Sequence, residues 1–208
     1  MTQNIISSFI KIALAFFMVY TNCAYAITLN VCYKDKICTM NANGKVYSCM
    51  VGKNGVIDKK DKREGDDMTP TGTYKLVKAY YRADRLSQDI IDKIAVPKQE
   101  INPWSLWGDD PKDPKTYNTY VDARNYPDDK PNFDVEHLMR TDGLYDLLYV
   151  IDYNLYKIGS AIFLHINDHP TAGCVGLKRD DLFELVPQIT NGSEITISLD
   201  NCPFSNQQ

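Results

Sequence analysis

The chain has 208 residues, of which 44% are hydrophobic and 24% are charged, and its formal net charge is −4. This length is enough for one domain with a sizeable hydrophobic core, and the interspersed charges form no basic stripe that would indicate nucleic acid binding. We therefore expect a single domain whose partner is not a nucleic acid.

The first 26 residues have the pattern of a secretory signal peptide. A short apolar segment follows Lys11, and Ala24-Tyr25-Ala26 supplies a small-x-small cleavage site. That segment is too short for a comfortable membrane span, and no other apolar stretch approaches about 18 residues. We expect an exported chain, in the periplasm or cell envelope, with one domain over residues 27–208 and no transmembrane anchor. Lipidation at Cys23 is the less favoured alternative, because the residues before it make a poor lipoprotein box.

The start of this domain predicts a β-meander. Residues 28–33, 36–40 and 45–51 alternate in polarity or are β-branched, as strands do. Asn43-Gly44 is typical of a two-residue hairpin turn between the second and third of these strands.

Loss of Cys23 with the signal peptide would leave five cysteines, an odd count that implies one free thiol in an exported protein. Cys174 is the natural candidate for that thiol, and the other four could form two disulfides in an oxidising compartment. A turn at Asn43-Gly44 would place Cys38 opposite Cys49 and leave Cys32 for Cys202. A small slip of register would allow another pairing, so the connectivity stays open.

The middle of the chain is rich in turn residues. A charged loop over residues 58–67 leads to a Pro- and Gly-punctuated turn and a strand within 68–77, and residues 86–94 fit a short helix. Residues 97–131 hold most of the prolines and both tryptophans, which predicts a loop-rich insertion. This insertion either lines a groove or is simply a cap with its own small apolar cluster.

The last third of the chain alternates short elements. We expect one or two helical turns over residues 134–140, then strands within 144–153 and 161–167. An amphipathic helix over 180–189 and a strand over 194–199 complete the prediction, which is therefore a mainly β fold with a few short helices.

The most informative stretch of the sequence runs from Ile162 to Leu177. An apolar run ends at His165, and a small-residue turn that contains Thr171 and Gly173 presents Cys174. A thiolate is a good nucleophile, a nearby imidazole can take its proton, and a glycine lets backbone N–H groups face a developing oxyanion. The pattern favours a thiol enzyme over the alternative of a Cys that only packs in the core.

These residues carry a family resemblance. Residues 64–74, with the block Thr-Pro-x-Gly, together with His165 and the Thr-x-Gly-Cys motif of residues 171–174, resemble the L,D-transpeptidase catalytic domain, also called the YkuD domain. The stretch over 136–154 also looks like one branch of that family, and the resemblance covers residues 46–199. It implies a β-sandwich with a few short helices.

The resemblance also implies an activity on peptidoglycan stem peptides. Cys174 would attack the carbonyl between the third-position diamino acid and D-alanine, and an amine of another stem would receive the acyl group. His165 would be the general base, and the N–H groups of Gly173 and Cys174 would form the oxyanion hole. With water as acceptor, the same enzyme would be an L,D-carboxypeptidase. No cofactor or metal is implied, and the oligomeric state is not indicated.

The chain departs from the commonest pattern of that family at the substrate contacts. Many members have Ser-His-Gly-Cys followed shortly by Arg, whereas this chain has Thr171 and Ala172 before the Gly and Gly176 after the Cys. An Arg there would grip a substrate carboxylate. Arg179 is a candidate replacement, with Arg140 and Lys178 as alternatives, although each also fits a solvated surface charge.

Three further residues are candidates for contacts with the substrate. His169 lies closer to Cys174 in sequence than His165 does, and His137 follows Glu136, but each also fits an ordinary surface or packed histidine. Thr171 fits either a substrate contact or a hydrogen bond within the turn. The acidic residues of the 58–67 loop suit a turn better than the paired acids of a glycosidase.

Rival classes fit less well. A metal hydrolase would need clustered ligands, and no zinc-binding helix of the His-Glu-x-x-His type is indicated, because His165 and His169 lie on a predicted strand and the loop after it. A papain-like enzyme needs a His after its Cys, and none follows Cys174. A sortase-like enzyme lacks the Thr-Pro-x-Gly block. The non-enzymatic alternative is a secreted peptidoglycan-binding module.

Overall fold

The computed structural model of the protein describes residues 25–153, 158–200 and 202. Most of the predicted signal peptide, residues 1–24, lies outside the described residues. Within the described ranges, no helix is both long and apolar enough to cross a membrane.

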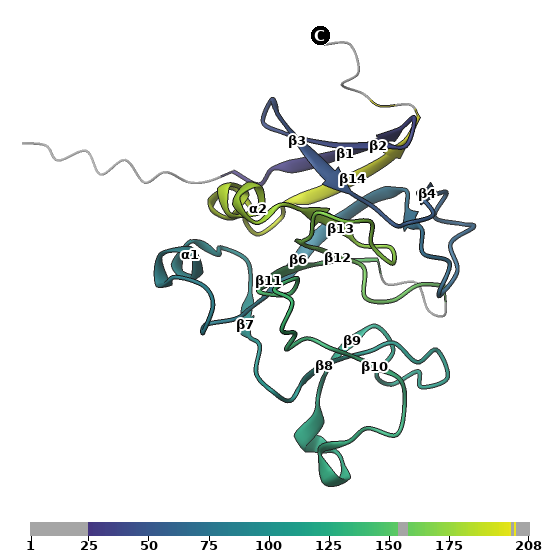
Figure 1. Ribbon diagram of the computed structural model, residues 1–208, viewed down its shortest axis with the longest axis vertical. Coiled ribbons are helices and arrows are strands. Elements are labelled where there is room, and N and C mark those ends of the chain that lie inside the picture. The colour runs from purple at the N-terminus through teal and green to yellow at the C-terminus, as the bar shows by residue number, and fades with distance from the viewer. Residues whose placement is uncertain (1–24, 154–157, 201, 203–208) are drawn as a thin grey trace, which may run out of the picture.

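One large sheet forms the body of the molecule (Figure 1). Its strands are β1 (Thr28–Lys34), β2 (Ile37–Ala42), β3 (Lys45–Met50), β6 (Gly72–Tyr81), β7 (Lys98–Glu100), β11 (Leu147–Ile151), β12 (Phe163–Ile166), β13 (Val175–Leu177) and β14 (Glu194–Leu199). The predicted meander of β1, β2 and β3 is confirmed, with Asn43-Gly44 at the turn between the antiparallel strands β2 and β3. The predicted last strand is confirmed as β14, which lies parallel to β1.

The sheet closes on itself through β6. The strand order is β11-β12-β13-β3-β2-β1-β14-β6-β7, and β6 also pairs with β11. The first residues of β6 pair with β14, and the remainder pairs with β11. Because one long strand belongs to both halves, the sheet folds over into the predicted mainly β sandwich.

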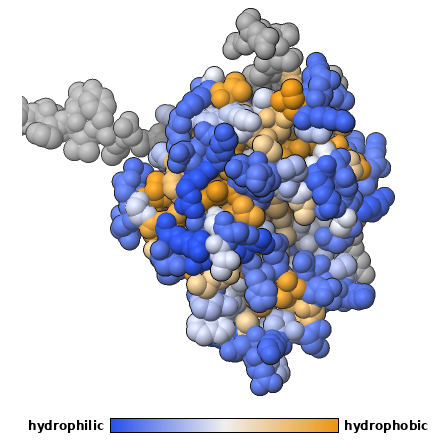
Figure 2. All heavy atoms as spheres, in the orientation of Figure 1, coloured by the Kyte–Doolittle hydropathy of each residue, from blue (hydrophilic) through white to orange (hydrophobic). Residues whose placement is uncertain are grey.

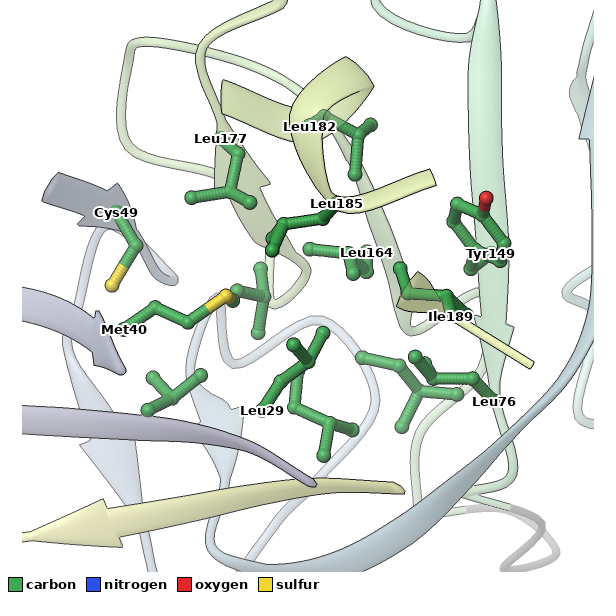
Figure 3. Packing of buried hydrophobic residues seen from close by; sticks show 14 of the residues in the cluster. Leu29, Met40, Cys49, Leu76, Tyr149, Leu164, Leu177, Leu182, Leu185 and Ile189 are labelled. Carbon is green, nitrogen blue, oxygen red and sulfur yellow. The ribbon is translucent and has the colours of Figure 1, made fainter. Parts of the chain in front are cut away.

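The main core fills the space between the two halves of this sandwich. Figure 3 shows side chains from β1, β2, β3, β6, β11, β12 and β13 that converge with those of the short helix α2 (Arg179–Leu185). Leu29, Leu164 and Leu182 are fully buried there. Each buried Leu contributes about 1.5–3 kcal/mol to the free energy of unfolding relative to an exposed one.

Hydrophilic residues cover most of the face seen in Figure 2, with smaller hydrophobic patches between them.

Short elements complete the fold. The predicted helix within 86–94 is confirmed as α1 (Gln88–Lys93), capped by the Ser87 hydroxyl, and the amphipathic helix within 180–189 consists of α2 and the 3-10 turn η3 (Val186–Gln188). The remaining elements are β4 (Val56–Ile57), β5 (Thr69–Pro70), β8 (Ser105–Gly108), β9 (Thr119–Asp122), η1 (Ala123–Asn125), η2 (Pro127–Asp129) and β10 (Val135–His137).

The insertion over residues 97–131 contains more regular structure than its composition suggests. Its strands β8 and β9 form a three-stranded sheet with β10, which lies at the opposite end of the molecule from β1 and β14 in Figure 1. Leu106, Val121 and Ala123 form a small buried cluster of their own, as the cap interpretation expects.

The predicted helical turns over 134–140 are wrong. Val135, Glu136 and His137 pair antiparallel with Gly108, Trp107 and Leu106 of β8. Backbone pairing with residues that lie 27, 29 and 31 positions earlier in the sequence therefore determines this conformation, and a local pattern cannot show such partners.

Both disulfides that follow from the hairpin register are present. Cys38 pairs with Cys49 across β2 and β3, and Cys32 pairs with Cys202. Cys174 is the free cysteine of the described residues, as predicted.

Candidate active site

Cys174 and His165 line the same cleft. This cavity of about 340 Å³ lies between the loop that contains Glu64, the middle of β10, and the segments on either side of β12. Thr171 and Ala172 from the turn before Cys174 also line it. The sequence-predicted nucleophile, base and turn residue are therefore brought together in one place.

The turn that presents Cys174 is held by the neighbouring strand and by its own threonine. The Thr171 N–H donates to the Val51 carbonyl at 2.9 Å, and the Lys53 N–H donates to the Thr171 carbonyl at 2.8 Å. The Thr171 hydroxyl accepts the Gly173 N–H at 3.1 Å and donates to the Cys174 carbonyl at 2.7 Å. Gly173 has φ +142, in the region that favours glycine, so the sequence Thr-x-Gly-Cys fits this turn.

The sulfur of Cys174 is buried among backbone groups. Its S–H donates to the Ala161 carbonyl at 3.0 Å, and the Phe163 N–H donates to Sγ at 3.3 Å. The residue is 7% exposed. Burial, with a smaller effect of the Glu136 carboxylate, raises the pKa of the Cys174 thiol to about 12, so the resting group is the neutral thiol at pH 7.

His165 is held by two backbone carbonyls. Its Nδ1 lies 3.0 Å from the Ile166 carbonyl oxygen and 3.3 Å from the Leu144 carbonyl oxygen, so Nδ1 carries the hydrogen. Nε2 is then the basic nitrogen of the ring. Burial lowers the pKa of His165 to about 4, so the imidazole is neutral at pH 7.

Tyr145 connects His165 to a charged wall of the cleft. Its ring packs edge-on against the His165 ring, with centroids 5.1 Å apart, and its hydroxyl donates to Glu136 Oε1 at 2.6 Å. The Arg140 guanidinium lies over the same tyrosine ring and 3.7 Å from Glu136 Oε1. Burial raises the pKa of Glu136, although the Tyr145 hydrogen bond opposes this.

The wall is mainly acidic. Glu64, Asp67, Asp109 and Glu136 line the cleft, and Arg140 is the only Lys or Arg among the described lining residues. Burial, followed by the charges of Glu136 and Glu64, raises the pKa of Asp109 to about 6. Asp109 Oδ1 is buried and accepts no hydrogen bond from the described part of the chain. Arg140 is itself paired with Asp142.

The other predicted contact residues lie outside this lining. The His169 side chain is 83% exposed and lies beside Asp168. His137 lies on β10 and lines a neighbouring cavity that shares Asp109, Glu136 and Arg140 with the cleft. Arg179 forms an ion pair with the buried Asp146 and lines a different cavity, near Leu144.

The acidic loop before the Thr-Pro-x-Gly block has two roles. The Asp66 carboxylate accepts the N–H groups of Arg63 and Met68, which is the turn-forming role that the sequence favours. Glu64 instead faces the cleft and accepts the Tyr117 hydroxyl at 2.5 Å.

A comparison with protein families decides the affiliation of this chain. The sequence profile of the L,D-transpeptidase catalytic domain, YkuD, matches residues 29–197. The chain belongs to this family. Among solved structures, it is similar to L,D-transpeptidase 1 of Mycobacterium tuberculosis, with 12% identity, a TM-score of 0.35, and coverage of 83% of this chain and 62% of that one.

A second similar structure is an L,D-transpeptidase from Mycobacterium smegmatis. The identity is 11% and the TM-score 0.35, with 83% of this chain and 59% of that chain covered. The chain thus spans about three fifths of the length of both mycobacterial proteins. None of the curated protein sequences matches it.

As a YkuD domain, the chain has no room for the Arg that many relatives have after the Cys. Gly176 lies in β13 between β12 and β3. A Cβ atom there would lie 2.8 Å from Asn167 Cβ and 3.3 Å from Met50 Cβ. A side chain at position 176 would therefore collide with its neighbours in this YkuD domain, and Arg140 is the one guanidinium among the described residues that line the cleft.

Sequence reasoning missed several residues of the YkuD site. Asp109 received no role, because its neighbours in space come from other elements. Glu136 and Tyr145 stood within the stretch that resembles the family, and that position was their only signal.

Proposed function

We propose that this protein is an L,D-transpeptidase that acts on peptidoglycan stem peptides through a Cys174 acyl-enzyme. The observation that carries the proposal is the presence of Cys174 and a neutral His165 in one cleft, within a chain of the YkuD family. Because Nδ1 of His165 is bound to backbone carbonyls, the lone pair of Nε2 is available to accept a proton.

The proposed first half-reaction transfers the stem to the enzyme. His165 Nε2 takes the thiol proton as Sγ forms a bond to the carbonyl carbon between the diamino acid and D-alanine. The tetrahedral intermediate then collapses, its C–N bond breaks, and the proton on Nε2 passes to the departing amine of D-alanine. The product is a thioester on Cys174.

The second half-reaction releases the acyl group. An amine of another stem attacks the thioester carbonyl while His165 takes its proton, and that proton returns to Sγ as the C–S bond breaks. Water in place of the amine would give the L,D-carboxypeptidase variant. The Gly173 N–H donates to Thr171 in the free protein, so its proposed part in an oxyanion hole requires that hydrogen bond to be exchanged for one to the substrate.

Export of the protein is part of the same proposal. Two disulfides are typical of an oxidising compartment, and peptidoglycan lies outside the cytoplasmic membrane. The predicted signal peptide would direct the chain out of the cytoplasm.

The experiment that tests the proposal is intact-mass spectrometry of the protein with purified tetrapeptide muropeptides. The wild type should gain the mass of the disaccharide-tripeptide less one water, as a thioester requires, and Cys174→Ala should not, while the exposed His169→Gln control should behave as the wild type. Cross-linked dimers among the products support transpeptidation, and freed tripeptides alone support the carboxypeptidase. If the folded wild type formed no adduct and no product, both enzymatic activities would be contradicted, and a peptidoglycan-binding module would be the remaining function.

A further inference from the structure

The thiol of Cys174 is held by one short backbone segment, residues 161–163. The Ala161 carbonyl accepts the S–H at 3.0 Å, and the Phe163 N–H donates to Sγ at 3.3 Å. The position of this segment therefore determines where the nucleophile and its proton lie in the free protein.

Ala161 has a conformation that it would not adopt alone. Its φ is +50, in the left-handed region, where a residue with a Cβ costs roughly 1–2 kcal/mol. Such strain persists only where the surroundings over-determine the backbone, and it clusters at functional sites. Contacts to Ala161 from elsewhere in the fold must therefore hold it.

Asn118 makes such a contact. Its Oδ1 accepts the Ala161 N–H at 3.1 Å and the Trp107 Nε1–H at 3.1 Å, and its Nδ2 donates to the Tyr153 carbonyl at 3.0 Å. These three partners fix the orientation of the amide group, because Oδ1 faces two donors and Nδ2 faces an acceptor.

The sequence context supports this role for Asn118. Asn118 belongs to the loop-rich insertion and lies 43 residues before Ala161. It has φ +57 itself, a conformation that asparagine tolerates better than most residues, and its own N–H donates to the Gly108 carbonyl at 2.8 Å. Trp107, held by the same amide oxygen, packs edge-on against Phe163, with ring centroids 5.0 Å apart. The insertion thus contacts residues 161 and 163 on either side of the thiol.

We propose that Asn118 is a positioning residue, which holds the Ala161 carbonyl on the Cys174 thiol and so makes the insertion part of the nucleophile's support. The effect of Asn118 on catalysis rests on the proposed function, whereas its hydrogen bond to the Ala161 N–H does not depend on that function. A hydrogen bond from S–H to a carbonyl favours the neutral thiol. Release of Ala161 should therefore make thiolate easier to form and, at the same time, place it less well for attack.

The test compares Asn118→Gly with Asn125→Gly, an exposed asparagine of the same insertion. Glycine adopts a φ of +57 without strain, so the first variant removes the side chain and keeps the backbone. Alkylation of Cys174 by iodoacetamide, followed by peptide mass spectrometry, is measured from pH 7 to pH 10. Below the pKa, each unit by which that pKa falls raises the thiolate fraction about tenfold and the alkylation rate by less than that, because a thiolate of lower pKa is a weaker nucleophile.

We expect Asn118→Gly to be alkylated about tenfold faster than the wild type and to form the muropeptide adduct about tenfold more slowly. Asn125→Gly should match the wild type in both. Asn118→Asp keeps an acceptor for the Ala161 N–H and should be alkylated at a rate closer to the wild type than to Asn118→Gly. A folded Asn118→Gly with the wild-type alkylation profile would overturn the positioning role.

A second measurement needs no variant. The Ala161 amide of the wild type should be protected from hydrogen exchange, and exchange at the unprotected rate in the folded protein would also overturn the proposal. Because neither alkylation nor exchange uses peptidoglycan, a wild type that forms no muropeptide adduct would contradict the proposed function and leave the role of Asn118 to be decided separately.

Discussion

Neither of the two central side chains of the cleft is ionised at neutral pH. The pKa of Cys174 is raised to about 12 and that of His165 lowered to about 4, in both cases mainly by burial. A preformed thiolate and imidazolium pair is therefore not the resting state. In the proposed mechanism, proton transfer from Sγ to Nε2 would therefore accompany substrate binding or attack, when the substrate brings its own polar groups into the cleft.

The first prediction concerns His165. Replacement by glutamine should lower the rate of acylation about 10²- to 10⁴-fold, because the general base is lost. Alkylation of Cys174 by iodoacetamide should change much less, because burial rather than His165 sets the pKa of the thiol. Pre-steady-state mass spectrometry gives the first rate, and His169→Gln is the matched control. Equal acylation in His165→Gln and the wild type would exclude His165 as the base.

The second prediction concerns Gly173. A Cβ at this position would lie 3.1 Å from the Met68 carbonyl oxygen and 3.2 Å from Ile162 Cδ1, and φ is +142. Gly173→Ala should lower the free energy of unfolding by about 1–3 kcal/mol and displace the nucleophile. Gly44→Ala is the control, since that glycine has φ +86 but nothing within 4 Å. Urea denaturation and adduct formation measure the two effects, and a Gly173→Ala protein as active as Gly44→Ala would contradict this.

The third prediction concerns Asp109. Its pKa is raised to about 6, above the ordinary value near 3.8, so the folded state holds the ionised carboxyl at a cost. That cost is fully present above pH 6 and disappears as the pH falls to 3.8. Asp109→Asn should therefore raise the free energy of unfolding at pH 7 and lose this advantage near pH 4, as urea denaturation at both pH values would measure. Equal stability of the two proteins at pH 7 would count against a strained carboxylate.

For single residues, the sequence predicts the candidate site where its members lie close together along the chain. Cys174, His165 and Thr171 lie within ten residues of one another, and their motif predicts a common site, which the cleft brings together. Tyr145 and Asp109 join that cleft from other parts of the chain, through tertiary contacts that no spacing shows.

At the scale of elements, β3 is the support on which the nucleophile turn is built. Val51 and Lys53, which directly follow this strand, accept from and donate to the Thr171 backbone, and β13 pairs with the strand itself at Gly176 and Leu177. The Cys38–Cys49 disulfide fastens β3 to β2 at that point. Local rigidity of the turn should therefore depend on this disulfide.

The fourth prediction separates the two disulfides. Chain-entropy arguments give about 3 kcal/mol for the 11-residue separation of Cys38 and Cys49, and about 5 kcal/mol for the 170-residue separation of Cys32 and Cys202. Replacing Cys32 and Cys202 by serine should therefore lower global stability more. Replacing Cys38 and Cys49 should accelerate hydrogen exchange at Thr171 more. If the Cys32 and Cys202 pair had the larger effect on the turn, β3 would not be its main support.

The success of sequence reasoning also varied among elements. Alternating polarity predicts β1 to β3 and β14, because each has one buried face and one exposed face. β10 has three residues of intermediate or high exposure and a distant partner, so it lacks that pattern. Its short polar sequence favours a helical turn when it is considered alone.

For the whole molecule, the order of strands in the closed sheet was beyond prediction from the sequence. Composition and hydrophobic spacing indicate a mainly β sandwich, and the resemblance to the YkuD domain supplies its type. The pairing of β6 with both β14 and β11 depends on the length and bend of one strand inside the assembled core.

The fifth prediction is the response of global stability to acid. The pKa of His165 is about 4 in the folded protein, below its ordinary 6.5, so the unfolded chain binds a proton first as the pH falls. The stability from this group is fully present above pH 6.5 and is lost towards pH 4, by up to about 1.4 kcal/mol for each pH unit. The wild type should lose more stability than His165→Gln over this range. Asp109 is present in both proteins and cancels in the difference, so parallel urea-denaturation curves would contradict the assignment.

The parallel pairing of β1 with β14 has a consequence for folding during synthesis on the ribosome. The first strand of the domain lies between β2 and the last strand, so one of its two edges stays bare until the end of the chain emerges from the ribosome. Contacts over such long sequence separations form slowly. Closure of the sheet is therefore a late event of biosynthesis, since the pairing of β1 with β14 waits until the last strand has left the ribosome.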